Sequence, residues 1–92
     1  MKTKSPFLNS VVECMYSRHY AKKSIETYIG WIAAYINFHN KRHPASMGNN
    51  EVELFLNHLV ITKNVASRTQ TTALNSLVFL YKHILQSELS LD

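Results

Sequence analysis

Residues 24–39 carry two neighbouring apolar stripes at helical spacing, and this pattern constrains the fold more than any other feature of the chain. A helix that is apolar over so much of its surface must be buried widely, so we expect it at the centre of a helical bundle. The first stripe is Ile25, Ile29, Ile32 and Ile36, and the second is Tyr28, Trp31, Tyr35 and Phe38.

The rest of the chain also reads as helical. Its 92 residues include two glycines and two prolines, too few for a β-rich fold with many tight turns. With 46% hydrophobic and 17% charged residues, the composition is that of a globular protein. We therefore predict a single all-α domain over residues 1–92, a compact four-helix bundle. The expected helices are 6–19, 24–39, 50–62 and 67–86.

Capping residues support these boundaries. Ser5 is a suitable N-cap for the first helix, with Pro6 at the favoured first helical position. Pro44 disfavours a helix just before it, and the third helix is expected to begin near Asn49 or Asn50. Ser67 and Gln70 have the spacing of a capping box for the fourth helix. The core face predicted for that helix is Leu74, Leu77, Val78, Tyr81, Ile84 and Leu85.

Positive charge is concentrated in the first half of the chain. Residues 1–46 hold seven Lys and Arg against two acidic residues, whereas residues 47–92 hold three against four. Two basic clusters, around Lys22 and Lys23 and around Lys41 and Arg42, flank the long apolar helix. A polyanion, and nucleic acid first of all, is the partner that this distribution favours, although an ordinary solvated surface also carries lysines.

Other classes of protein find little support. The single Cys14 excludes an intrachain disulfide, no apolar run reaches membrane-spanning length, and the N-terminus lacks a secretory core, so we expect a reducing, cytoplasmic setting. No nucleophile elbow, phosphate-binding glycine loop or HExxH motif is present, and we expect no catalytic residue and no cofactor. His39 and His43 are four residues apart, but Pro44 argues against one continuous helix, so no metal site is expected.

The polar face of the fourth helix offers side chains that reach phosphates and base edges in a major groove. They combine a guanidinium, hydroxyls, an amide and an ammonium at three-and-four spacing. These residues are Arg68, Thr71, Thr72, Asn75 and Lys82.

An ordered set of short motifs gives a more specific indication. The set contains RHY at 18–20, KRHP at 41–44, MG at 47–48, EV..FL..L at 51–59, TQ at 69–70, AL at 73–74 and FLYK at 79–82. With Tyr28, Trp31, Ile36, Phe38 and His39, this pattern resembles the N-terminal domain of integron integrases, which are tyrosine recombinases. The resemblance covers about residues 7–92.

The resemblance implies a SAM-like core-binding domain, one arm of a clamp around recombination-site DNA, whose second and fourth helices approach the DNA. It also implies that residues 86–92 lead into a linker to a separate C-terminal catalytic domain, so this chain alone should not cut or rejoin DNA. The expected partners are recombination-site DNA, that catalytic domain and other recombinase protomers, with no membrane and in a bacterial cytoplasm.

The predicted DNA contacts rest on the positions of the basic and polar residues and on the resemblance to integron integrases. Relatives commonly carry arginines where this chain has Ala33, Ala34 and Asn37, so phosphate contact in the middle of the second helix should be weaker, while Arg68 partly offsets the loss. The predicted contacts are Arg18, Lys22, Lys23, Ser24, Lys41, Arg42, His43, Arg68, Thr69, Gln70, Thr71, Thr72, Asn75 and Lys82.

Two alternatives remain open at this stage. The apolar excess of the second helix could form the face of a protein-interaction or oligomerisation module that does not bind DNA. A small helix-turn-helix repressor is compatible with the short connection at 63–66, but not with the long one at 40–49.

Overall fold

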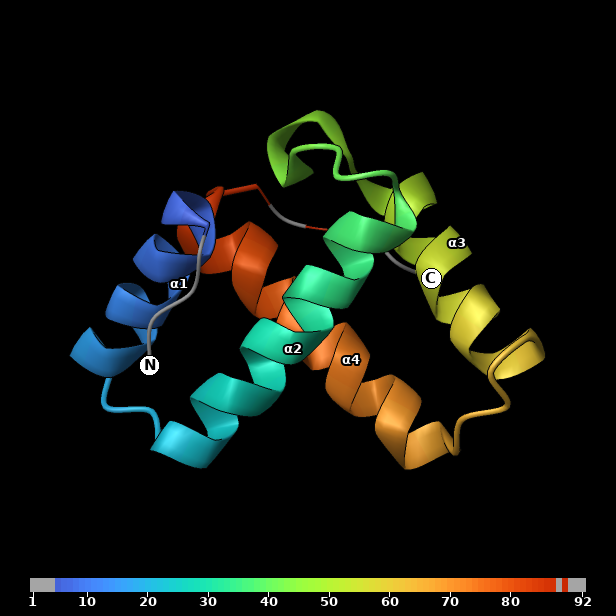
Figure 1. Ribbon diagram of the computed structural model, residues 1–92, viewed down its shortest axis with the longest axis horizontal. Helices are drawn as coiled ribbons and strands as arrows, with labels where there is room; N and C mark the ends of the chain where they lie inside the picture. Colours follow the sequence, from blue (N-terminus) through green and yellow to red (C-terminus); the bar gives the residue numbers. More distant parts are fainter. Residues whose placement is uncertain (1–4, 88, 90–92) are drawn as a thin grey trace.

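The computed structural model describes residues 5–87 and 89, which form four α-helices and two short helical turns without any strand (Figure 1). This confirms the all-α, four-helix prediction. The elements are α1 (Pro6–Ser17), α2 (Lys22–Phe38), the 3-10 turn η1 (Pro44–Ser46), α3 (Asn49–Ile61), α4 (Ser67–Phe79) and the π-helical segment η2 (Leu80–Ile84).

The predicted boundaries need small corrections. The first helix ends at Ser17 instead of residue 19, and the second begins at Lys22 instead of residue 24 and ends at Phe38 instead of residue 39. The third helix, Asn49–Ile61, lies one residue earlier than expected at each end. The predicted fourth helix, 67–86, is α-helical as far as Phe79 and continues as the π-helical η2. Of the expected linker residues 86–92, only 86, 87 and 89 lie within the described residues.

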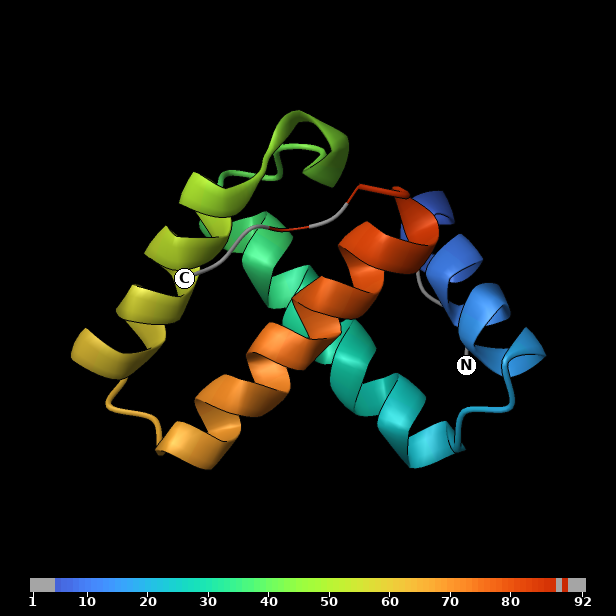
Figure 2. The same ribbon diagram turned by 180° about the vertical axis from the view of Figure 1, so that it is seen from behind.

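The two long helices α2 and α4 cross near their middles, so that the molecule resembles an X in projection (Figures 1 and 2). Helix α1 flanks α2 on one side, and α3 packs against α4 on the other. The N-terminal ends of α2 and α4 both lie along one edge, at the bottom of both views. The connection from α2 to α3 lies at the opposite edge, beyond the crossing.

The apolar stripes of α2 supply the centre of the core, as expected. Ile25, Ile29, Ile32 and Tyr35 are buried, while Trp31 and Ile36 are partly buried against them. Phe38 was predicted in the same stripe but is 37% exposed, although its ring still packs against Phe55 and His58. Most of the apolar surface of α2 is therefore packed within the chain.

The core face predicted for α4 is wrong in part. Val78 is 39% exposed and Leu74 is only half-buried, whereas Phe79 and the small polar Ser76 are buried. The buried sector of α4 is centred on Ala73 and Leu77, and Leu74 and Val78 each follow one of these by a single residue, roughly 100° around the helix. Leu77, Tyr81, Ile84 and Leu85 pack in or against the core as predicted.

Of the two helix-capping predictions, one is confirmed and the other is wrong. The Ser5 side chain accepts a hydrogen bond from the Leu8 N–H at 3.3 Å, with Pro6 at the first helical position, as predicted. The Ser67–Gln70 capping box is wrong, because Ser67 is already helical and the N-cap is Ala66, which has no side-chain acceptor. The Gln70 amide donates instead to the Leu56 carbonyl, at a long 3.5 Å.

Left-handed residues end the helices without using glycine. His19, Asn40, Lys41 and Asn64 all have φ between 53° and 64°, whereas no described glycine has a positive φ. A non-glycine side chain in this region costs about 1–2 kcal/mol. At Lys41 the cost is offset by a 2.8 Å hydrogen bond from its N–H to the Ile36 carbonyl, which closes the end of α2. This explains how a chain with so few glycines makes its sharp turns.

Candidate nucleic-acid interface

The edge where α2 and α4 begin has two helix N-termini without side-chain caps. The N-cap positions are Ala21 and Ala66, and neither helix has an acidic residue in its first turn. Helix α1, in contrast, is capped by Ser5, and at the start of α3 the Glu51 carboxylate accepts from the Gly48 N–H at 2.7 Å. The first N–H groups of α2 and α4 therefore have no side-chain acceptor, and their dipoles favour an anion.

Exposed cations surround these two N-termini. Lys22 and Lys23 form the first turn of α2, and Arg68 is the second residue of α4. Lys63, which sequence reasoning did not select, is exposed in the turn before α4, and its position just ahead of that helix is the signal that could have identified it. Within residues 5–87 and 89 none of these cations has a carboxylate partner, since the one ion pair there joins Arg42 to Glu51.

The hydroxyl groups predicted on the fourth helix are directed toward its own backbone. Thr71 Oγ1 donates to the Ser67 carbonyl at 3.0 Å, and Thr72 Oγ1 donates to the Arg68 carbonyl at 3.1 Å. Such hydroxyls must rotate before they can donate to a phosphate. Asn75 is exposed further along the helix. The predicted contacts Ser24, Thr69 and Gln70 lie in the first turns of α2 and α4, with Ser24 exposed and the other two half-buried.

Arg18, the C-cap residue of α1, and Lys82, in η2, both act on the charge of His83. Partial burial, followed by the positive charges of Arg18 and Lys82, lowers the pKa of His83 below its ordinary 6.5. The His83 ring also stacks at a tilt on Phe79, with centroids 5.0 Å apart. Arg18 and Lys82, predicted separately, thus form one basic patch that includes the end of α1.

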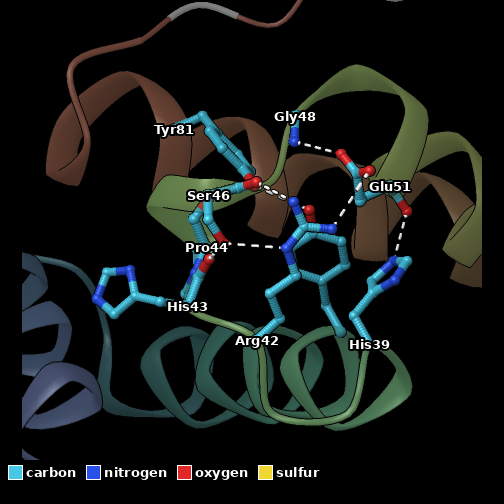
Figure 3. A network of polar contacts seen from close by, with 9 residues as sticks. His39, Arg42, His43, Pro44, Ser46, Gly48, Glu51 and Tyr81 are labelled. Carbon is cyan, nitrogen blue, oxygen red and sulfur yellow. Dashed lines mark hydrogen bonds and ion pairs between the residues drawn. The ribbon is translucent and has the colours of Figure 1, made fainter.

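The remaining predicted contacts, Lys41, Arg42 and His43, lie at the opposite edge of the molecule from α2's first turn (Figures 1 and 3). The 17 residues of α2 separate the two basic clusters by roughly 25 Å. The structure therefore does not bring the two clusters together.

Arg42 is held within its own loop (Figure 3). Its Nη2 donates to the Ser46 carbonyl at 2.5 Å, its Nε donates to Ser46 Oγ at 3.1 Å, and its Nη1 lies 3.8 Å from Glu51 Oε2. Of the loop residues predicted to contact DNA, Arg42 is thus the one whose charge is already paired with a carboxylate. This pairing reduces the positive field of the loop.

The two histidines considered as metal ligands make other contacts. His39 Nε2 is hydrogen-bonded to the Glu51 carbonyl at 2.8 Å, and His43 Nδ1 accepts from the Ala45 N–H at 3.0 Å. The residues that the structure describes contain no group of three or more His, Cys, Asp or Glu side chains that could hold a metal ion.

A mostly apolar pocket of about 360 Å³ lies between α1, the second half of α2 and the loop that follows α2. Ala33 and Asn37, two of the three uncharged positions noted in the sequence of the second helix, contribute to its wall, and Lys41 and His43 line it from the loop. The pocket does not include any residue of the α2–α4 edge. Among the described helices, none is both long and apolar enough to cross a membrane.

Comparison with known proteins shows which protein family the chain matches. A family model described as phage integrase, N-terminal SAM-like domain, matches residues 7–91. A protein of Escherichia coli and one of Pseudomonas aeruginosa, each named integrase/recombinase, are each 39% identical to the chain over 71 residues. The matched segment is 77% of this chain and 21% of either relative, so the chain spans about a fifth of the length of these relatives.

Proposed function

The chain belongs to the family of phage integrase N-terminal SAM-like domains, and on this premise we propose that it is the DNA-binding, core-binding domain of an integron-type tyrosine recombinase. The domain would form one arm of a clamp on recombination-site DNA during site-specific recombination. Its other partners would be a C-terminal catalytic domain of the same protein and neighbouring recombinase protomers. Cleavage and rejoining would be carried out by that catalytic domain and not by these residues.

The observation that carries the proposal is the pair of helix N-termini along one edge. Both lack a side-chain cap and a first-turn carboxylate, and both carry exposed cations. Backbone N–H groups at a helix start, together with Lys and Arg side chains, are the groups that proteins commonly use to bind phosphate oxygens. Two such ends on one rigid pair of crossed helices would bind two phosphate groups of one duplex.

The proposed contacts follow from this edge. Lys22, Lys23 and Arg68 would neutralise phosphates at this edge. Arg18 and Lys82 would add a second basic contact, since Lys82 lies in η2, at the other end of α4 from Arg68. Ser24, Thr69, Gln70, Thr71, Thr72 and Asn75 lie behind them and would reach the sugar-phosphate backbone or the groove. Lys41, Arg42 and His43 would make a smaller contribution, because they lie at the far end of α2 and Arg42 is engaged with Glu51.

A salt titration with two matched double variants tests the proposal. Lys22→Ala with Lys23→Ala, and Lys41→Ala with Arg42→Ala, each remove two cations, one pair from either end of α2. Removing one phosphate contact should flatten the slope of log K against log [salt] by about 0.9. We expect the first variant to flatten the slope by up to about 2 and the second by less than about 1.

Binding of a recombination-site duplex is measured by fluorescence anisotropy at several salt concentrations, after circular dichroism shows that both variants are folded. An equal or larger change of slope in the Lys41/Arg42 variant would mean that the interface lies at the other edge. Absence of any salt-dependent binding by the wild-type chain would remove the proposed function itself.

A further inference from the structure

A buried pair of tyrosine hydroxyls ties α2 to the end of α4 on the far side of their crossing. Tyr35 lies in the last turn of α2, and Tyr81 follows α4 in η2. Their side chains are 0% and 2% exposed, and their hydroxyl oxygens are 2.8 Å apart. This is a direct polar contact between α2 and η2, the segment that continues α4.

The direction of the hydrogen bonds follows from the third member of the network, the Pro44 carbonyl (Figure 3). Tyr81 Oη lies 2.9 Å from this carbonyl, which can only accept, so Tyr81 must donate its single proton there. Tyr35 therefore donates to Tyr81. Burial raises the pKa of both tyrosines, so both protons stay in place over the ordinary pH range.

Because α2 and α4 cross, this contact also affects the distance between their N-terminal ends. Helices are stiff over the length of α2 and α4, and the two helices cross near their middles (Figures 1 and 2). When two stiff rods are held together at a fixed crossing point, as the packed core holds α2 and α4, the separation of their ends on one side of the crossing fixes the separation on the other side. The tyrosine pair lies on the C-terminal side, and the two uncapped N-termini lie on the opposite side.

We infer that Tyr35 and Tyr81 are positioning residues that set the separation between the N-termini of α2 and α4, and through it the spacing of the two phosphate-binding ends. This inference rests on the proposed function for its effect on DNA, but not for its effect on the helices. The apolar core between α2 and α4 sets the crossing approximately. The hydrogen bond between Tyr35 and Tyr81 narrows the range of distances between the two helices, because hydrogen bonds are directional and dispersion contacts are not.

The variant that tests this inference is Tyr35→Phe. It removes the bond between the helices but leaves Tyr81 donating to Pro44, so the loop after α2 stays anchored. Tyr16→Phe is the control, because Tyr16 is 44% exposed on α1 and takes no part in this network.

The first measurement is the distance between two spin labels, placed at Glu26→Cys on α2 and Ser67→Cys on α4 in a Cys14→Ala background. Both labelled positions are exposed, and neither belongs to the proposed contacts. We expect Tyr35→Phe to widen the distance distribution and Tyr16→Phe to leave it unchanged. A distribution that Tyr35→Phe does not widen would overturn the inference, whether or not the chain binds DNA.

The second measurement is duplex affinity of the unlabelled variants. The number of phosphate contacts stays the same, so Tyr35→Phe should raise Kd by about two- to tenfold without changing the salt slope. The same change in Tyr16→Phe, or no change in Tyr35→Phe despite a widened distribution, would contradict a positioning role. If the wild-type chain does not bind the duplex, the proposed function fails while the distance measurement still decides the role of the tyrosine pair in the fold.

Discussion

The Glu51 carboxylate lies 2.7 Å from the Gly48 backbone N–H and 3.8 Å from the Arg42 guanidinium, so a single side chain caps α3 and restrains the loop before it. The Gly48 hydrogen bond is the main cause that lowers the pKa of Glu51 below its ordinary 4.5, and Arg42 and His39 add smaller contributions. The sequence analysis did not connect Glu51 to Arg42.

This arrangement predicts an acid-sensitive contribution to stability. A carboxyl whose pKa is lower in the folded state stabilises the fold above its unfolded pKa, and this stabilisation is lost as the pH falls through the folded value. The free energy of unfolding should therefore decline below about pH 4.5. Urea titrations between pH 3 and 7 check this, with Glu51→Gln as the comparison. The prediction is wrong if the free energy of unfolding of Glu51→Gln declines as steeply with falling pH as that of the wild type.

Removing the Tyr81 hydroxyl from the buried network should destabilise the domain more than removing the Tyr35 hydroxyl. Tyr35→Phe deletes one hydrogen bond and should cost about 0.5–1.5 kcal/mol. Tyr81→Phe also leaves the Tyr35 hydroxyl buried without an acceptor and should cost about 2–3 kcal/mol. Chemical denaturation of the two variants measures the difference. Equal losses would mean that Tyr35 finds another acceptor and that the assigned bond directions are wrong.

A cap added at the start of α4 should stabilise the domain and weaken DNA binding. Ala66 has φ −67° and ψ 155°, which an N-cap residue adopts. Ala66→Asp should add about 0.5–2 kcal/mol of stability, because its carboxylate accepts from the first-turn N–H groups. The same carboxylate would occupy these groups and repel a phosphate, so duplex affinity should fall.

Ala66→Asn separates the two effects of that change. It caps the helix about as well but carries no charge, so its loss of affinity should be smaller. Thermal unfolding and fluorescence anisotropy of both variants provide the comparison. Tighter binding by Ala66→Asp than by the wild type would show that no phosphate approaches this helix end.

The His83 ring reports on the basic patch formed by Arg18 and Lys82. In the free domain its pKa should lie below 6.5, and Arg18→Ala should raise it by removing a positive charge. A phosphate bound at the patch should raise it as well, because an anion favours the imidazolium. NMR titration of the His83 ring protons, without and with duplex, measures these shifts.

Arg68→Ala is the control for that titration. Arg68 lies at the opposite end of α4, so its removal should leave the His83 pKa unchanged in the free domain. A His83 pKa that stays constant when saturating duplex is added would remove Arg18 and Lys82 from the interface.

Local patterns in the sequence determined the four helices, the Ser5 cap and the central place of α2, because periodicity and capping act over a few neighbouring residues. The motif order was sufficient to indicate the family. The exposed Val78 went unpredicted, since it depends on how α4 is rotated against α2 and α3, which no short window of sequence encodes. The Ser67 cap was wrong because α4 begins one residue earlier than the capping box requires, with Ala66 as its N-cap.

Only the tertiary structure decided which basic residues lie on the same edge of the molecule. In the sequence, Lys22 and Lys41 flank one helix and look like one surface, but the length of α2 places them at opposite edges. Lys22 and Arg68, far apart along the chain, lie on one edge, because α2 and α4 cross with both N-termini on the same side. The crossing is set by side-chain packing between distant segments, and it determines which charges lie along one edge.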